Sequence, residues 1–115
     1  MPTHPEPTAA QRLVGDIAPK LADLTDEVLF GDIWARPELP RRDRSLVTVA
    51  ALVTNGSTEQ LVGHLRIAKQ NGLSEAELVE AITHLAFYAG WPRAMSAITV
   101  AKRVFAEDRD QRENG

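Results

Sequence analysis

The sequence contains no cysteine, and this absence excludes several kinds of chemistry. A chain without thiols cannot form a disulfide, bind a metal through thiolate or carry out thiol redox reactions. Long apolar runs are absent too, because no stretch approaches the roughly 20 apolar residues that span a bilayer. The first eight residues are polar and rich in proline, so we predict no signal peptide and, by default, a cytoplasmic location.

Basic residues are also too few for a nucleic-acid-binding surface. The chain has 13 Lys and Arg against 16 Asp and Glu, which gives a formal net charge of −3. A helix-turn-helix around Asn71-Gly72 would place residues 74–91 against DNA, and this segment holds glutamates but no lysine or arginine. Carboxylates in that place would repel phosphate. We therefore expect neither nucleic acid nor a membrane as a partner.

The length of 115 residues fits one ordinary domain, and 43% hydrophobic with 25% charged residues is normal for a globular protein. We predict a helical domain over residues 11–106, between a flexible lead over 1–10 and a frayed, charged tail over 107–115. No segment alternates with period two, which disfavours a sheet. The predicted fold class is therefore all-α, a small bundle of about five helices with short connections.

Apolar residues recur at helical spacing over residues 17–34, and this first helix is expected to end before Pro37. The second helix, from about residue 41 to Asn55-Gly56, is apolar on nearly every side, which predicts full burial. Its valines would also suit a buried strand, so the residues leave both alternatives open.

Capping patterns mark the helices that follow. Ser57 with Gln60 and Ser74 with Glu77 both have the spacing of a capping box. The helices that they start are expected to end at Asn71-Gly72 and at Gly90. A fifth helix then begins near Pro92, because proline is well accommodated in a first turn.

The apolar surface of the second predicted helix exceeds what a bundle of this size encloses. Phe87, Tyr88 and Trp91 add to this surplus near the end of the fourth helix. Such a surplus predicts burial against other copies of the chain, and hence a homo-oligomer. The alternative is that the N-terminal helix covers these faces within one chain.

Two histidines are candidate catalytic residues. His64 lies three residues after Leu61 and four before Ala68, so it should face the inner stripe of its helix. His84 is expected to face inward in the same way, with Tyr88 one turn later. Histidine can act as a general acid or base near neutral pH; the alternative is two hydrogen-bonded packing residues. Two histidines without an accompanying ligand motif predict no metal site.

Arg44 is a candidate binding residue because it opens the long apolar run of the second helix. A guanidinium in such a place needs a carboxylate, which it binds bidentately. That carboxylate is either a substrate acid or a neighbour such as Asp43 or Glu59. Arg41 and Arg42 beside it are expected to be solvated helix-start residues.

Five segments follow one another in a distinctive order. They are WARPELP at 34–40, RSLVTVA at 44–50, HLR at 64–66, NGL at 71–73 and EAITHLAFYAGWP at 80–92. In this order and spacing they resemble the carboxymuconolactone decarboxylase family, over about residues 17 to 105. The combination is specific, whereas each segment alone is weak.

The resemblance implies an alkylhydroperoxidase-like helical subunit that assembles into a ring-shaped trimer or hexamer. It also implies the decarboxylation, without a cofactor, of a small carboxylated lactone. The namesake reaction of aromatic catabolism converts γ-carboxymuconolactone into β-ketoadipate enol-lactone and carbon dioxide. In that reaction Arg44 would hold a carboxylate, and His64 or His84 would donate the proton to carbon. The water-excluding pocket would be lined by Tyr88, Trp91 and Phe87.

The thiol peroxidases of the same family carry a Cys-x-x-Cys pair ahead of the matching histidine. Here those two positions hold Ser57 and Gln60, and Ser45 stands near the glutamate of their proton relay. A hydroxyl cannot replace a thiolate in disulfide exchange, so a thiol peroxidase is excluded. The alternatives to the lactone decarboxylase are an enzyme for another small acid or lactone, and a non-catalytic oligomeric protein that binds a metabolite.

Overall fold

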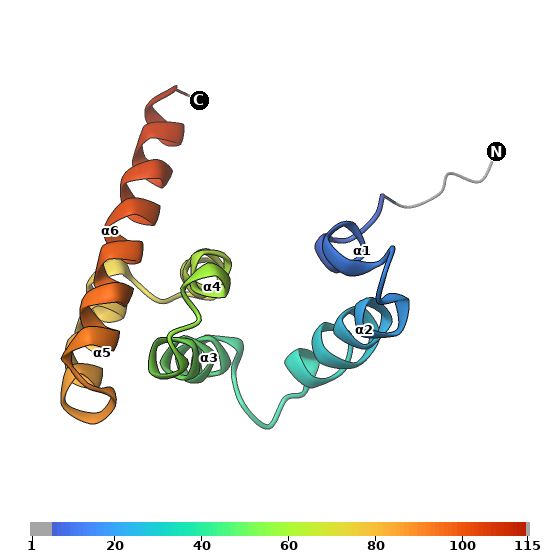
Figure 1. The fold of residues 1–115 in the computed structure, drawn as a ribbon, viewed down its shortest axis with the longest axis horizontal. Coiled ribbons are helices and arrows are strands. Elements are labelled where there is room, and N and C mark those ends of the chain that lie inside the picture. Colours follow the sequence, from blue (N-terminus) through green and yellow to red (C-terminus); the bar gives the residue numbers. More distant parts are fainter. Residues whose placement is uncertain (1–5, 115) are drawn as a thin grey trace. The chain divides into compact units, whose positions relative to one another are not determined.

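The computed structural model describes residues 6–114, and each regular element in this part of the chain is helical (Figure 1). No strand occurs among these residues, which confirms the predicted all-α class. They form two compact units, one ending at Leu39 and the other starting at Pro40. Residues 1–5 of the predicted lead lie outside the described part. None of the helices over residues 6–114 is long and apolar enough to cross a membrane.

The N-terminal unit is broken into short helical segments, whereas the sequence predicted one helix over residues 17–34. The segments are α1 (Ala9–Val14), α2 (Pro19–Asp23), the π-helical η1 (Leu24–Phe30) and the 3-10 turn η2 (Ile33–Ala35). Pro19 explains why α2 starts where it does. Proline is favoured in a first turn, and Ala18 before it has a non-helical backbone with φ −137° and ψ 62°.

The end of the predicted lead, residues 8–10, contains the cap and the first residues of α1. The Thr8 hydroxyl accepts the Gln11 amide at 3.1 Å, and the Gln11 side chain accepts the Thr8 amide at 2.9 Å. This reciprocal capping box satisfies two amides that a helix start otherwise leaves open. The Thr8 hydroxyl also donates to Asp26 at 2.7 Å, which ties α1 to η1.

Apolar burial in the N-terminal unit is sparse. Within residues 6–39, Ala22 and Trp34 are the buried apolar side chains, and Phe30 stacks on Trp34 with ring centroids 5.9 Å apart. The large apolar residues that remain exposed are Leu13, Ile17, Leu21, Leu24, Val28, Leu29, Phe30, Ile33 and Leu39. Exposed apolar surface of this extent is typical of a face that contacts another protein molecule.

The C-terminal unit is a four-helix core. Its helices are α3 (Arg41–Asn55), α4 (Thr58–Gln70), α5 (Glu75–Ala89) and α6 (Trp91–Asn114). Helix α3 packs against the other three, and α5 lies beside α6 (Figure 1). The predicted inner stripe of α4 is confirmed, since Leu61, Leu65 and Ala68 are fully buried in the shared core.

One predicted capping box is confirmed and the other is wrong. Ser74 and Glu77 form the reciprocal pair at the start of α5, with both hydrogen bonds at 3.0 Å. Ser57 makes no capping bond from its side chain, because its backbone (φ −85°, ψ 67°) departs from the extended geometry of Ser74 (φ −77°, ψ 159°). The Ser57 and Gly56 amides instead close the end of α3 on the Leu52 and Val53 carbonyls.

Full burial of α3 was predicted, and within this chain the prediction is wrong. Ser45, Val49 and Val53 form its buried face, whereas Val47 is 63% exposed. The reason is geometric, because the packing of α4, α5 and α6 covers one side of a helix and leaves the opposite side open. The apolar far side of α3 is therefore surface in a single copy.

The predicted frayed tail is helical, because α6 continues to Asn114. Arg66 of α4 bonds Asp108 at 3.1 Å and Glu107 at 2.9 Å. Lys69 bonds Asp108 at 3.4 Å and Glu75 at 2.5 Å, which joins α4, α5 and α6 in one network. Charges that suggest a solvated tail in the sequence thus hold the end of α6 against the core.

Candidate functional site

His64 lies on α4 as predicted, half-buried and turned toward the protein interior. Its Nδ1 atom is fully buried. Burial lowers the pKa of His64 below its usual value of 6.5, because the charged imidazolium loses solvation. The neutral ring therefore predominates near pH 7, which is the form that can accept a proton.

His84 was predicted to face inward, but the structure exposes it on the surface of α5. Helix α5 buries Leu78 and Ile82. His84 follows Ile82 by two residues, which is about 200° round a helix, so it points away from the core. Its ring contacts that of Tyr88 one turn later, with centroids 5.0 Å apart and planes tilted by 33°.

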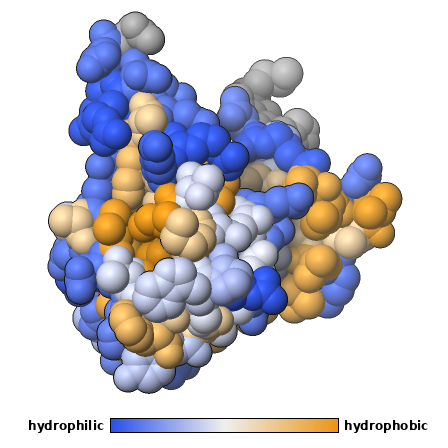
Figure 2. Space-filling model, turned by 60° about the vertical axis from the view of Figure 1, so that its left-hand side comes forward, coloured by the Kyte–Doolittle hydropathy of each residue, from blue (hydrophilic) through white to orange (hydrophobic). Residues whose placement is uncertain are grey.

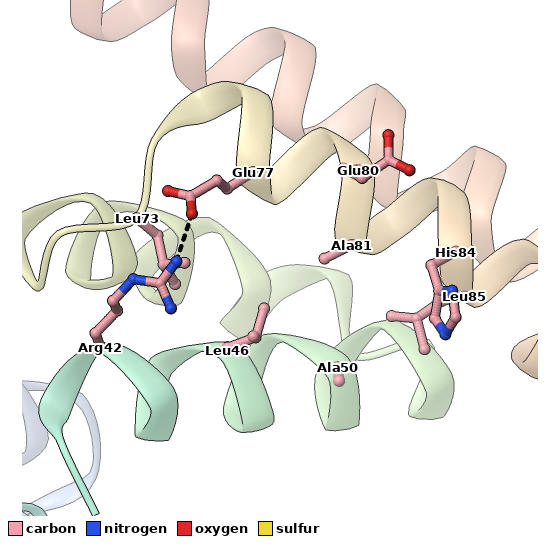
Figure 3. Close-up of a pocket in the computed structure, with 9 residues that line it drawn as sticks. All are labelled: Arg42, Leu46, Ala50, Leu73, Glu77, Glu80, Ala81, His84 and Leu85. Carbon is pink, nitrogen blue, oxygen red and sulfur yellow. Dashed lines mark hydrogen bonds and ion pairs between the residues drawn. The ribbon is translucent and has the colours of Figure 1, made fainter.

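A groove of about 460 Å³ runs between α3 and α5, and His84 lines one end of it. Figure 3 shows α3 and α5 facing each other across this groove. Its apolar lining is Leu46, Ala50, Leu73, Ala81 and Leu85. Its polar lining is Arg42, Glu77, Glu80 and His84. The volume lies within the range of about 300–1,000 Å³ that is typical of small-molecule sites.

Arg42 and Glu77 form an ion pair at the other end of the groove (Figure 3). The Glu77 carboxylate also accepts the Ser74 backbone amide, and this bond, followed by the one from Arg42, lowers the pKa of Glu77. Glu77 therefore stays ionised well into the acidic range. The cap of α5 thus fixes a carboxylate that holds the Arg42 guanidinium at the groove.

Arg44, the predicted carboxylate-binding residue, is half-buried on α3 and does not line this groove. Arg42 lies two residues earlier, about 200° round the helix, and so presents its side chain on the groove side. From the sequence, Arg42 is expected to be a solvated helix-start residue. The spacing of Arg42, Leu46 and Ala50, at successive intervals of four, places them on one stripe and is the pattern that would have revealed it.

The three aromatic residues proposed to line a pocket are exposed in the single chain. Tyr88 is 78% exposed and lies against His84. Phe87 and Trp91 are 74% and 58% exposed and form an edge-to-face pair with centroids 5.3 Å apart. Trp91 also borders a shallow hollow of about 150 Å³ with Met95 and Ile98. Figure 2 shows apolar patches at the surface below the hydrophilic end of α6.

The predicted site residues are therefore distributed over several places. His84 lines the groove and contacts Tyr88, which is outside its lining. Phe87 and Trp91 meet at the α5–α6 corner, and His64 lies on α4. In residues 6–114 no group of three or more His, Asp or Glu side chains is placed to hold a metal ion.

The fold and the groove define a small, thiol-free, all-helical domain with a recess of small-molecule size between two helices. Residues 19–103 match the sequence profile of the carboxymuconolactone decarboxylase family. The chain belongs to that family, as the sequence pattern predicted.

Two of three similar proteins are named as decarboxylases, each of a different compound. The 4-carboxymuconolactone decarboxylase of Acinetobacter baylyi is 44% identical over 78 residues, which cover 68% of this chain and 58% of that protein. The nitrosuccinic acid decarboxylase npaB of Metarhizium robertsii is 34% identical over 91 residues, or 79% of this chain and 64% of that protein. A 15.0 kDa protein from the nqo9–nqo10 intergenic region of Paracoccus denitrificans is 29% identical over 110 residues, or 94% and 79%. The chain thus matches less than two thirds of the length of either decarboxylase.

Proposed function

We propose that this chain is a decarboxylase subunit whose substrate is a small carboxylated lactone, with γ-carboxymuconolactone as the first compound to test. The observation that carries the proposal is the 44% identity over 78 residues to a 4-carboxymuconolactone decarboxylase. The alternative substrate is another small acid or lactone, and the similarity to a nitrosuccinic acid decarboxylase supports keeping that class open.

The chemistry of these two compounds favours a common mechanism. Loss of carbon dioxide breaks a C–C bond and leaves its electron pair on the substrate. In the lactone that pair can delocalise toward the ring carbonyl, and in nitrosuccinic acid it can delocalise into the nitro group. The substrate then supplies its own electron sink, and the protein has to hold the carboxylate, stabilise the anion and return a proton to carbon.

His64 and Arg44 are the residues that we propose for two of these roles. The neutral, half-buried imidazole of His64 can take up a proton from water and donate it to the carbon that lost carbon dioxide. Arg44 carries a fixed positive charge on α3 for a carboxylate. His84 is the second candidate proton donor, with Tyr88, Phe87 and Trp91 as substrate-binding residues.

We also propose a homo-oligomer, a trimer or a hexamer, as the working form. Exposed apolar side chains on α3 and at the α5–α6 corner support this proposal, among them Val47, Phe87 and Trp91. Burial of these side chains between copies would supply the exclusion of water that the single chain lacks at its aromatic residues.

The test is to incubate the purified protein with γ-carboxymuconolactone and to measure the release of carbon dioxide. We expect turnover by the wild type, and a loss of kcat by about 100-fold or more in His64→Ala, the size typical of a removed general acid or base. Arg44→Ala should chiefly raise KM. Arg41→Ala, an exposed neighbour on the same helix, is the matched control and should retain activity. Absence of both turnover and binding in the wild type would rule out this substrate.

A further inference from the structure

We propose that the groove between α3 and α5 binds a small carboxylic acid, with Arg42 holding a carboxylate at one end and His84 contacting the ligand at the other. This inference rests on the proposed decarboxylase function and gives it a binding site. Neither Arg44 nor His64 lines this groove. It is therefore a separate assignment that can fail on its own.

The shape and lining of the groove suit a ligand of this size. Its volume of about 460 Å³ is bounded on the α3 side by Leu46 and Ala50 and on the α5 side by Ala81 and Leu85. Apolar walls of this kind remove water from a ligand, and they strengthen the few polar contacts at the ends. Polar groups at the two ends with apolar walls between them match an acid with a short carbon skeleton.

The Arg42 side chain is held in place but remains accessible. One terminal nitrogen donates to Glu77, the other donates to Asp43 at 3.3 Å, and the side chain is 43% exposed. A guanidinium has five N–H donors, so it can hold these partners and still donate to a ligand carboxylate. Because the Ser74 amide fixes Glu77 at 3.0 Å, the guanidinium stays at the groove when no ligand is bound.

Two carboxylates and one guanidinium line the groove, and it is the arrangement of these charges, not their sum, that favours an acid at the Arg42 end. The Glu77 carboxylate is already hydrogen-bonded by Arg42 and by the Ser74 amide. The Glu80 carboxylate is directed away from α3 in Figure 3, whereas the His84 ring extends toward the α3 side. An anion that enters between the helices therefore meets the remaining donors of Arg42 and the ring nitrogens of His84.

The experiment uses succinate, a four-carbon dicarboxylate, as the probe and succinamide as its uncharged counterpart. Calorimetry on the full chain should show binding of succinate and at least about 10-fold weaker binding of succinamide, because charge-assisted hydrogen bonds are lost. Arg42→Ala should weaken the binding of succinate by about 10-fold or more. Arg42→Lys should recover part of that loss, because an ammonium keeps the charge without the bidentate fork. Arg41→Ala should bind as the wild type does, and His84→Ala should bind several-fold more weakly.

A second comparison separates the role of Glu77 at the groove from its role as a helix cap. Ser74→Ala removes the hydroxyl side of the capping box and leaves the Arg42–Glu77 pair, so succinate affinity should stay near the wild-type value. Glu77→Ala should lower that affinity, and Glu77→Gln should restore part of it because an amide oxygen still accepts from Arg42.

The outcomes distinguish this inference from the proposed function. If the wild type decarboxylates γ-carboxymuconolactone but Arg42→Ala and Arg41→Ala bind succinate equally, the groove assignment is overturned and the decarboxylase proposal stands. If succinate binds through Arg42 but no tested lactone turns over, the acid site stands and the substrate proposal fails. A wild type that binds no succinate, or a groove that is buried by a second copy of the chain, overturns the acid site.

Discussion

His64 and His84 both lie on core helices of one unit, but their surroundings give the two rings different chemical properties. His64 shares the buried side of α4 with Leu61 and Leu65, and its pKa is lowered by that burial. His84 lies on the far side of α5 from Ile82 and packs its exposed ring on Tyr88. The first is therefore suited to accept and donate a proton near neutral pH, and the second to contact an incoming ligand.

The lowered pKa of His64 predicts how stability depends on pH. Below the unfolded-state value of 6.5 the unfolded chain binds a proton that the folded chain resists, so the free energy of unfolding should fall as the pH drops from 7.5 to 5.5. His64→Gln should make this slope shallower, since glutamine does not titrate. Urea denaturation at several pH values measures both slopes, and equal slopes would contradict the assigned burial effect.

The sequence located His64 correctly because its spacing from the α4 stripe is unambiguous. It failed for His84, since α5 is apolar over much of its surface and the pattern alone does not say which face the core takes. The prediction also failed for Arg42. Its place among charged residues at a helix start suggests a solvated side chain, and its position at the groove follows from its ion pair with Glu77. Contacts between residues 35 positions apart are invisible to a local pattern.

The capping patterns at helix ends gave one correct prediction and one wrong prediction, and one capping box was not predicted. Ser74-x-x-Glu77 forms the box that its spacing predicts. Thr8-x-x-Gln11 has the same pattern and forms the same box, although the region was predicted as a flexible lead. Ser57-x-x-Gln60 has the pattern too, but the Ser57 amide donates to the Leu52 carbonyl at the end of α3, and the Ser57 backbone is not extended. A cap forms only where the preceding turn leaves the residue free to be extended.

Two glycines of neighbouring helices should respond to alanine with opposite signs. Gly56 ends α3 with φ +72°, and a Cβ there would lie 1.7 Å from an Arg93 nitrogen. Gly63, within α4, has nothing within 4 Å of the same ideal Cβ. Gly56→Ala should destabilise the fold by about 1 kcal/mol or more, and Gly63→Ala should stabilise it by about 0.5–1 kcal/mol. Chemical denaturation decides the signs, and a stabilised Gly56→Ala would refute the left-handed turn.

The ion-pair network at the end of α6 predicts that the Asp108 carboxylate stabilises this part of the helix. Burial acts to raise the pKa of Asp108, but the bonds from Arg66 and Lys69 outweigh it and leave that pKa lowered. Its contribution is present above pH 3.8, the unfolded-state value, and is lost as the pH falls through the lower folded pKa. At pH 7, Asp108→Asn should speed amide hydrogen exchange over residues 107–114, whereas the exposed control Asp110→Asn should change it little. Equal protection in both variants would show that the network does not hold the helix.

At the scale of the whole molecule, the helical class and the number of core helices followed from periodicity, whereas the fate of the exposed apolar surface did not. Periodicity identifies which residues are apolar, but it does not distinguish a face covered by the same chain from a face covered by another copy. The N-terminal unit shows this limit clearly, because Leu13, Ile17 and Leu21 have helical spacing and remain exposed. If the proposed oligomer forms, its interfaces would complete the pattern of burial.

The proposed oligomer makes a direct prediction. Phe87→Ser and Trp91→Ser should each shift the mass measured by light scattering during gel filtration toward that of a 12.6 kDa monomer, because both remove apolar surface from the α5–α6 corner. Lys102→Ser, on an exposed position of α6, is the control and should leave the mass unchanged. A wild type that elutes as a monomer at all concentrations would contradict the proposal.

The turn between α3 and α4 has a consequence for how this family can change its chemistry. At position 57 the fold uses the backbone amide and makes no cap from the hydroxyl, and position 60 is exposed on the first turn of α4. The Ser57 hydroxyl forms no cap, so we expect the fold to tolerate substitution at positions 57 and 60, where the family resemblance places the cysteine pair of the thiol peroxidases. Ser57→Cys with Gln60→Cys should therefore cost little stability, which makes this turn the place in the chain to test whether a redox pair can be grafted.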